Sequence, residues 1–103
     1  WCAAFVNAVL TESGIPNNTL HMHPYAARSF LDWGTTVKTP IPGDLIIFPR
    51  GNISWQGHVG FYLSTTIINN IEYYYILGGN QSNKVSIDLY RSSKLLGIRR
   101  SIL

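Results

Sequence analysis

The chain changes character at a turn rich in proline and glycine, Pro40 to Gly43, and this change constrains the fold more than any other feature. Before the turn, apolar residues recur at helical spacing; after it, they alternate or form short blocks typical of strands. With 103 residues, the chain is large enough for one domain with one core. Helices followed by a run of strands predict a single α+β domain over 1–103, with N-terminal helices packed on one antiparallel sheet.

The first part of the chain predicts two helices. The first covers 1–13, because apolar and small residues recur there at helical spacing, and Gly14 and Pro16 end it. The composition of 17–24 is that of a loop. The second helix covers 25–33 and ends at Gly34.

The second part predicts about five strands. Asn69 and Asn70 are typical of a tight hairpin turn, and 80–83 of a looser one. The run 73–76 is so apolar that we expect it in a central strand covered on both sides. The expected strands cover 44–48, 58–64, 73–78, 84–88 and 95–100.

Composition excludes several classes of protein. With 46% hydrophobic and 13% charged residues, the chain is too apolar for a disordered one. Its single cysteine cannot form an internal disulfide. The longest apolar runs have strand length, so we expect no membrane span. Because the chain begins at Trp1, inside the expected helix, we interpret it as a fragment of a longer protein.

Cys2 lies at the start of the first expected helix. Unpaired N–H groups and the positive end of the helix dipole lie there, and both favour the thiolate that nucleophilic chemistry requires. The alternative is that Cys2 is a small buried hydrophobic residue, which is the commoner role of a free cysteine. Taken alone, the cysteine favours that second reading.

Two further positions could complete a nucleophilic site. His58 begins a strand between Gly57 and Val59, where an imidazole needs a partner to offset its desolvation. A base histidine also needs a group that orients it, and Asn80, or equally Gln81, follows the central strand. Each position also has a structural interpretation, as a satisfied core histidine and as ordinary turn residues.

Three motifs in order resemble those of the NlpC and CHAP cell-wall hydrolases, papain-like cysteine amidases and endopeptidases of bacteria and their phages. The motifs are Trp-Cys-Ala-Ala-Phe-Val at 1–6, Pro-Gly-Asp-Leu-Ile-Ile-Phe at 42–48 and Gly-His-Val-Gly-Phe-Tyr at 57–62. The resemblance implies a papain-like fold in which Cys2 is the nucleophile, His58 the general base and Asn80 the polar third residue. Family members commonly carry a second histidine, or a glutamate and an asparagine, at the third position.

By the same resemblance, Asp44 is structural and caps the turn that leads into the first strand. Trp55 and Gln56 come just before His58, at the expected rim of the cleft, where the indole could contact the substrate. The equally open alternative is that Trp55 caps the edge of the sheet. The implied substrate is peptidoglycan, cut as an endopeptidase or an N-acetylmuramoyl-L-alanine amidase without a cofactor. The site of action would lie outside the cytoplasm, for a secreted, periplasmic or virion-associated protein, tethered to other domains or to a phage tail.

Other functions remain open from the sequence. A papain-like deamidase or acyltransferase toxin would use the same Cys2 and His58 on a protein, and a catalytically inactive relative would only bind the wall. His21 and His23 are a weak metal pattern that loop solvation explains better, so we expect no metal. Nucleic acid is not an expected partner, because the basic residues are few and we interpret the C-terminal group as a solvated face: Arg91, Lys94, Arg99 and Arg100.

Overall fold

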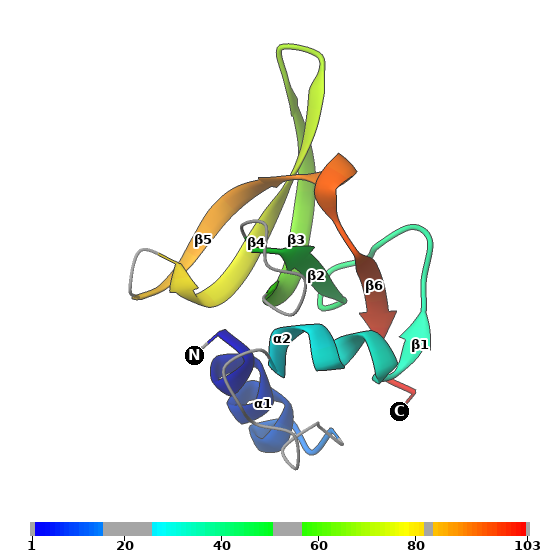
Figure 1. Ribbon diagram of the computed structural model, residues 1–103, viewed down its shortest axis with the longest axis vertical. Coiled ribbons are helices and arrows are strands. Elements are labelled where there is room, and N and C mark those ends of the chain that lie inside the picture. Colours follow the sequence, from blue (N-terminus) through cyan, green and yellow to red (C-terminus); the bar gives the residue numbers. More distant parts are fainter. Residues whose placement is uncertain (1, 16–25, 51–56, 82–83, 103) are drawn as a thin grey trace.

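The computed structural model describes residues 2–15, 26–50, 57–81 and 84–102. It confirms the α+β class: helices lie on one side of an antiparallel sheet (Figure 1). The helical elements are α1 (Cys2–Glu12), α2 (Ala26–Ser29) and two 3-10 turns, η2 (Phe30–Asp32) and η3 (Ser92–Lys94). The strands are β1 (Thr35–Thr36), β2 (Leu45–Pro49), β3 (Gly57–Ile68), β4 (Ile71–Gln81), β5 (Lys84–Arg91) and β6 (Gly97–Arg100).

The sheet has six strands in the order β1-β6-β2-β3-β4-β5, rather than the five expected. The additional strand is β1, whose Thr35 and Thr36 pair with Arg100 and Arg99. Both threonines are exposed, and two residues are too few to produce an alternating pattern. A strand this short is recognised only from its partner.

The β3–β4 hairpin confirms the turn predicted at Asn69 and Asn70. Both residues have left-handed backbones, with φ of 53° and 65°, which is the conformation that a two-residue type I′ turn requires. Ile68 pairs with Ile71 directly beside this turn. Both strands extend well beyond their predicted ranges, so that the hairpin projects from the rest of the molecule (Figure 1).

β4 is not covered on both sides, contrary to the prediction for 73–76. Tyr74 and Ile76 are buried, but Tyr75 between them is 37% exposed. The strand lies next to the edge strand β5, where the outward face of the sheet is open to solvent around Tyr75 and Leu89. Tyrosine tolerates such a position because its hydroxyl can remain in water while its ring packs on a neighbour.

The sheet rolls up on the side away from the helices. Phe48 on β2 stacks on Tyr90 of β5, with ring centroids 4.8 Å apart, although β3 and β4 lie between these two strands in the sheet. Only a strongly curved sheet brings such rings into contact. The concave face is filled by one apolar cluster: Ile46, Phe48, Tyr62, Tyr74, Ile76 and Ile98.

The convex face carries the helices. Val6 and Leu10 of α1 are buried on it at the predicted helical spacing, against Ile47 and Val59 of the sheet. The expectation of several N-terminal helices is confirmed only in part, since α1 is the one helix longer than a single turn within residues 2–15, 26–50, 57–81 and 84–102. The predicted 25–33 helix is a four-residue turn, α2, continued by the 3-10 turn η2.

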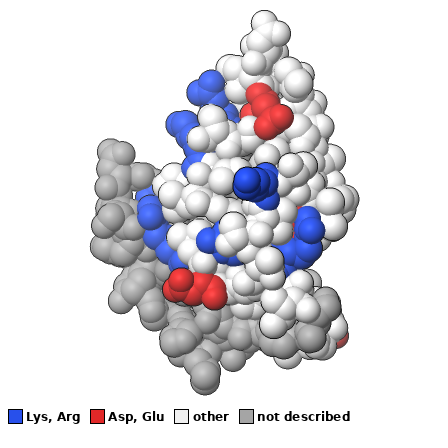
Figure 2. Space-filling view, turned by 90° about the vertical axis from the view of Figure 1, so that its right-hand side faces the viewer, with Lys and Arg blue, Asp and Glu red and all other residues white. Residues whose placement is uncertain are grey.

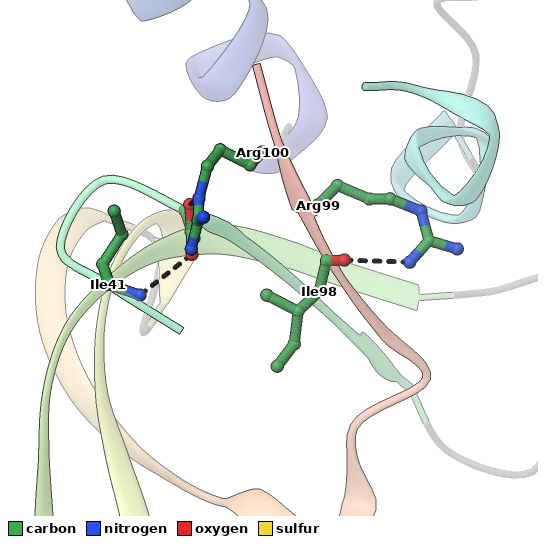
Figure 3. A network of polar contacts seen from close by, with 5 residues as sticks. Ile41, Ile98, Arg99 and Arg100 are labelled. Atoms are coloured by element: carbon green, nitrogen blue, oxygen red, sulfur yellow. Dashed lines mark hydrogen bonds and ion pairs between the residues drawn. The ribbon is translucent and has the colours of Figure 1, made fainter. Parts of the chain in front are cut away.

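Asp44 is structural, as predicted. It closes a turn in which its N–H donates to the Ile41 carbonyl at 3.0 Å, and Gly43 adopts φ of 96°, a backbone that favours glycine. The Asp44 carboxylate is 2% exposed. It accepts the Ile41 N–H at 2.9 Å and two bonds from the Arg100 guanidinium, both at 2.8 Å (Figure 3).

Arg91 and Lys94 are exposed, as expected of a solvated face, but Arg99 and Arg100 also make contacts within the fold. Arg100, whose side chain is 40% exposed, is paired with Asp44. The Arg99 side chain donates to the Leu31 carbonyl at 2.9 Å and to the Ile98 carbonyl at 3.0 Å (Figure 3). Both arginines therefore tie the last strand to the rest of the fold. Figure 2 shows basic side chains on one face of the molecule, with acidic and uncharged ones between them.

Candidate functional site

The Cys2 thiol lies beside the first residue of β3. Cys2 is the first residue of α1 and is 6% exposed. Its Sγ is 3.9 Å from the Gly57 carbonyl oxygen, a distance at which a thiol makes a weak hydrogen bond. The helix thus delivers the sulfur to the backbone immediately before His58.

His58 is buried at the same end of the sheet, with 2% of its surface exposed. It is paired with Phe48 in the strand register, and its ring stacks on Tyr90 with centroids 5.2 Å apart and 18° between the ring planes. His58 therefore points to the concave face, whereas Cys2 packs in the helix-side cluster. The two side chains come from different packing layers and are brought to one end of the sheet, where β3 begins.

Tyr90 connects these groups electrostatically. Burial raises the pKa of the Tyr90 phenol above its ordinary value of 10.0, and the nearby charge of Asp88 raises it further. Arg50 lowers the same pKa, while Cys2 raises it. The Tyr90 ring itself faces His58, on which it stacks. At neutral pH Tyr90 is uncharged.

Arg50 is a member of the site that the sequence did not reveal. It follows β2, is half-buried, and its Nη2 lies 3.0 Å from the His58 Nδ1. Guanidinium groups only donate hydrogen bonds, so in this contact Nδ1 must accept and the imidazole is neutral, with its proton on Nε2. Arg50 can be recognised as a neighbour of His58 only from the β2–β3 pairing, which sets Pro49 opposite Gly57. In the sequence alone, Arg50 is one basic residue among several.

Parts of the fold approach Gly57, the residue before His58, closely. A Cβ at Gly57 would lie 3.0 Å from the Phe48 carbonyl oxygen and 2.9 Å from the Cγ of Arg28. Two sheet residues and α2 therefore converge on the start of β3. This convergence requires glycine and holds the Gly57 carbonyl toward Cys2.

Several predicted site residues fall outside what the structure describes. Asn80 and Gln81 close β4 by their backbones, but their side chains lie outside the described part of the structure. Trp55, Gln56 and the histidine pair, His21 and His23, are wholly outside the described residues. Within 2–15, 26–50, 57–81 and 84–102, no three histidine, cysteine or acidic side chains are grouped so as to hold a metal ion.

The arrangement supplies a thiol, an imidazole with one protonated nitrogen, and a guanidinium. These are the components of nucleophilic acyl transfer with a cation beside the base. The chain matches no model of a protein family and no curated protein sequence. Among the described residues, no helix has the length and apolarity needed to cross a membrane.

Proposed function

We propose that this chain is a papain-like cysteine hydrolase that cuts amide bonds of bacterial peptidoglycan, with Cys2 as nucleophile and His58 as general base. The observation that carries the proposal is the position of the Cys2 sulfur, 3.9 Å from the carbonyl of Gly57. A helix start and a strand start, 55 residues apart in the chain, bring a thiol and an imidazole to one end of the sheet. The three cell-wall hydrolase motifs predict this pairing.

The mechanism follows from the protonation state of His58. In the proposed mechanism Nδ1, once released by the Arg50 guanidinium, takes the Cys2 proton as the sulfur attacks the substrate carbonyl carbon. The Cys2 N–H, which has no partner within the helix because it opens α1, donates to the developing oxyanion. The imidazolium then protonates the leaving amine, and water hydrolyses the thioester.

Orientation of the imidazole is assigned to Asn80, with Gln81 as the alternative. Both residues end β4, the strand that pairs with β3, so either amide oxygen could accept the proton of Nε2. Trp55 and Gln56, which immediately precede Gly57, are proposed to line the cleft for the sugar or peptide of the wall. The protein would then act outside the cytoplasm, as a secreted, periplasmic or virion-borne enzyme.

Digestion of purified peptidoglycan tests this proposal. We expect the wild type to release fragments whose masses and new amino groups show whether the sugar–peptide amide or a stem-peptide bond is cut, and we expect Cys2→Ala to release none. Asp32→Ala, on the exposed turn η2, is the matched control and should behave as the wild type. Unchanged muropeptides after prolonged incubation with folded wild type would contradict the proposal.

Thiol reactivity separates the alternatives in that case. If folded Cys2 is alkylated faster than the same cysteine in the urea-unfolded chain, the thiol is activated and a different acyl substrate, as for a deamidase or acyltransferase, is indicated. If folded Cys2 reacts no faster, the chain is better described as a wall-binding module.

A further inference from the structure

Arg50 is placed where a substrate would meet the proposed catalytic pair. Its guanidinium is half-buried and donates to His58 at 3.0 Å, and its charge acts on Tyr90 across the stacked rings. A guanidinium in such a place normally has an acidic partner, because a neutral imidazole nitrogen compensates the buried positive charge only in part.

No acidic side chain of this protein serves as that partner. All five acidic residues of the chain lie among the described residues, and none of them is within ion-pair distance of Arg50. Glu12 and Asp32 are exposed. The other three carboxylates accept bonds elsewhere in the fold: Asp44 from Arg100, Asp88 from Ser86 and Glu72 from Ser92.

The surroundings of His58 hold one negative charge. Tyr90 is uncharged at neutral pH, whereas the Asp88 carboxylate on the same strand accepts a bond from Ser86 at 3.0 Å, keeps its charge and raises the pKa of Tyr90. Asp88 lies beyond ion-pair distance of Arg50. Arg50 is therefore left without a direct ionic contact to any acidic side chain among the described residues.

We infer that Arg50 is a specificity-determining residue that binds a carboxylate of the substrate close to the amide bond being cut. The inference rests on the proposed acyl-transfer function and names its substrate class: acyl compounds with a free carboxylate within reach of the scissile carbonyl. A carboxylate can accept two parallel bonds from a guanidinium, and such a charged pair is stronger than one bond to a neutral nitrogen. A bound substrate therefore draws the guanidinium from Nδ1 and leaves that nitrogen to accept the Cys2 proton.

Two alkylating reagents that differ only in charge test the inference. Iodoacetate carries a carboxylate next to the reacting carbon, whereas iodoacetamide carries a neutral amide. Each forms a bond from sulfur to carbon with loss of iodide, and each reports on Cys2 alone because the chain has one cysteine. We expect the rate ratio of iodoacetate to iodoacetamide to be about 10-fold higher for the folded protein than for the same chain unfolded in urea.

Variants identify the arginine responsible. Arg50→Gln should lower the ratio to the value of the unfolded chain, while Arg50→Lys, which keeps the charge but not the planar fork, should keep part of the preference. Arg91→Gln is the matched control, since Arg91 is exposed at the far end of β5, and should keep the wild-type ratio. Far-ultraviolet circular dichroism and thermal unfolding confirm that each variant is folded.

A wild-type ratio equal to that of the unfolded chain, or an unchanged ratio in folded Arg50→Gln, would overturn the inference. Its failure is distinguishable from that of the proposed function. If the ratio depends on Arg50 but peptidoglycan stays intact, the carboxylate site is supported and the wall is the wrong substrate. If peptidoglycan is cut and the ratio does not depend on Arg50, the hydrolase is supported and the role of Arg50 is refuted.

Discussion

Two polar centres lie at opposite ends of β2 and differ in how far their charges are satisfied. Asp44, just before the strand, is buried, with three short hydrogen bonds to its carboxylate. Arg50, just after the strand, donates to a neutral histidine and has no acidic partner among the described residues. A compensated charge holds a fold together, whereas an uncompensated one is available to a ligand.

This comparison predicts that variants at the two ends fail in different ways. Substitutions around Arg50 and His58 should impair chemistry while the protein stays folded. Substitutions at Asp44 should lower the free energy of unfolding but leave the reactivity of the folded molecules unchanged.

The largest effect is expected for His58→Gln. Peptidoglycan hydrolysis should fall by at least about 10³-fold, since the base that takes the thiol proton is lost. The glutamine amide oxygen can still accept a bond from Arg50, so the melting temperature should change little. The measurement is the initial rate of fragment release together with a thermal melt. Substantial activity in the folded variant would remove His58 from the mechanism.

Asp44→Ala should be the most destabilising of these substitutions, by upwards of about 2 kcal/mol, because the three hydrogen bonds to the buried carboxylate are lost, although its partner Arg100 is 40% exposed. Urea unfolding measures the change, and Asp32→Ala, at an exposed position, should stay within about 0.5 kcal/mol of wild type. The alkylation rate of the fraction that stays folded should match that of the wild type. If Asp44→Ala lowered thiol reactivity without lowering the free energy of unfolding, Asp44 would belong to the chemistry rather than to the stability of the fold.

Tyr90 belongs to both the core and the site, and Tyr90→Ala should show both effects. Loss of the stacks on Phe48 and His58 should cost about 2 kcal/mol, less than for a fully buried ring because Tyr90 is half-buried. It should also slow alkylation of Cys2, since His58 loses its packing. Tyr90→Phe keeps the ring and is the control for both measurements. Equal stability of the two variants would mean that the stacks contribute nothing.

The smallest effect is in the alkaline titration. Burial, with a further contribution from Asp88, raises the pKa of Tyr90 above 10.0 in the folded protein. The folded state thus holds this proton more tightly than the unfolded state, so the associated stability is complete below about pH 10 and is lost as the pH rises through the folded pKa. Absorbance near 295 nm follows the phenols, and Tyr90→Phe should remove one late-titrating group.

That late component has a second source. Burial, followed by the charge of Glu72, also raises the pKa of Tyr74, and this group should remain in Tyr90→Phe. If Tyr90→Phe instead loses a phenol that titrates near pH 10 and keeps the late component unchanged, Tyr90 is solvated in solution and its connection to the site is weakened.

The sequence predicted the fold class, the turn before β2 and the hairpin at Asn69 because these depend on local patterns and on residues with special backbone preferences. It overestimated the second helix and the cover over β4, and it missed β1, because these depend on what packs against them. The sequence around Tyr75 is the same whether its ring is buried or exposed to solvent. The position of β4 next to the edge strand determines how exposed the ring is.

For the site, Cys2 and His58 were selected by the three motifs that resemble cell-wall hydrolases rather than by position alone, and their roles stay predictions. Arg50 could not be selected, since its contact with His58 depends on the pairing of β2 with β3. The contacts that Arg99 and Arg100 make within the fold were missed for the same reason. Which carbonyl or carboxylate a long cationic side chain reaches is a property of the assembled sheet.

The projecting β3–β4 hairpin makes the protein convenient for attachment. Its tip lies at the far end of both strands from Gly57 and Gln81, and cross-strand pairs from Ile68 to Phe61 separate it from the site. A short epitope or a fluorescent amino acid inserted between Asn69 and Asn70 would leave the single thiol as the only cysteine. The same molecule could then be anchored to a surface while its reactivity is followed.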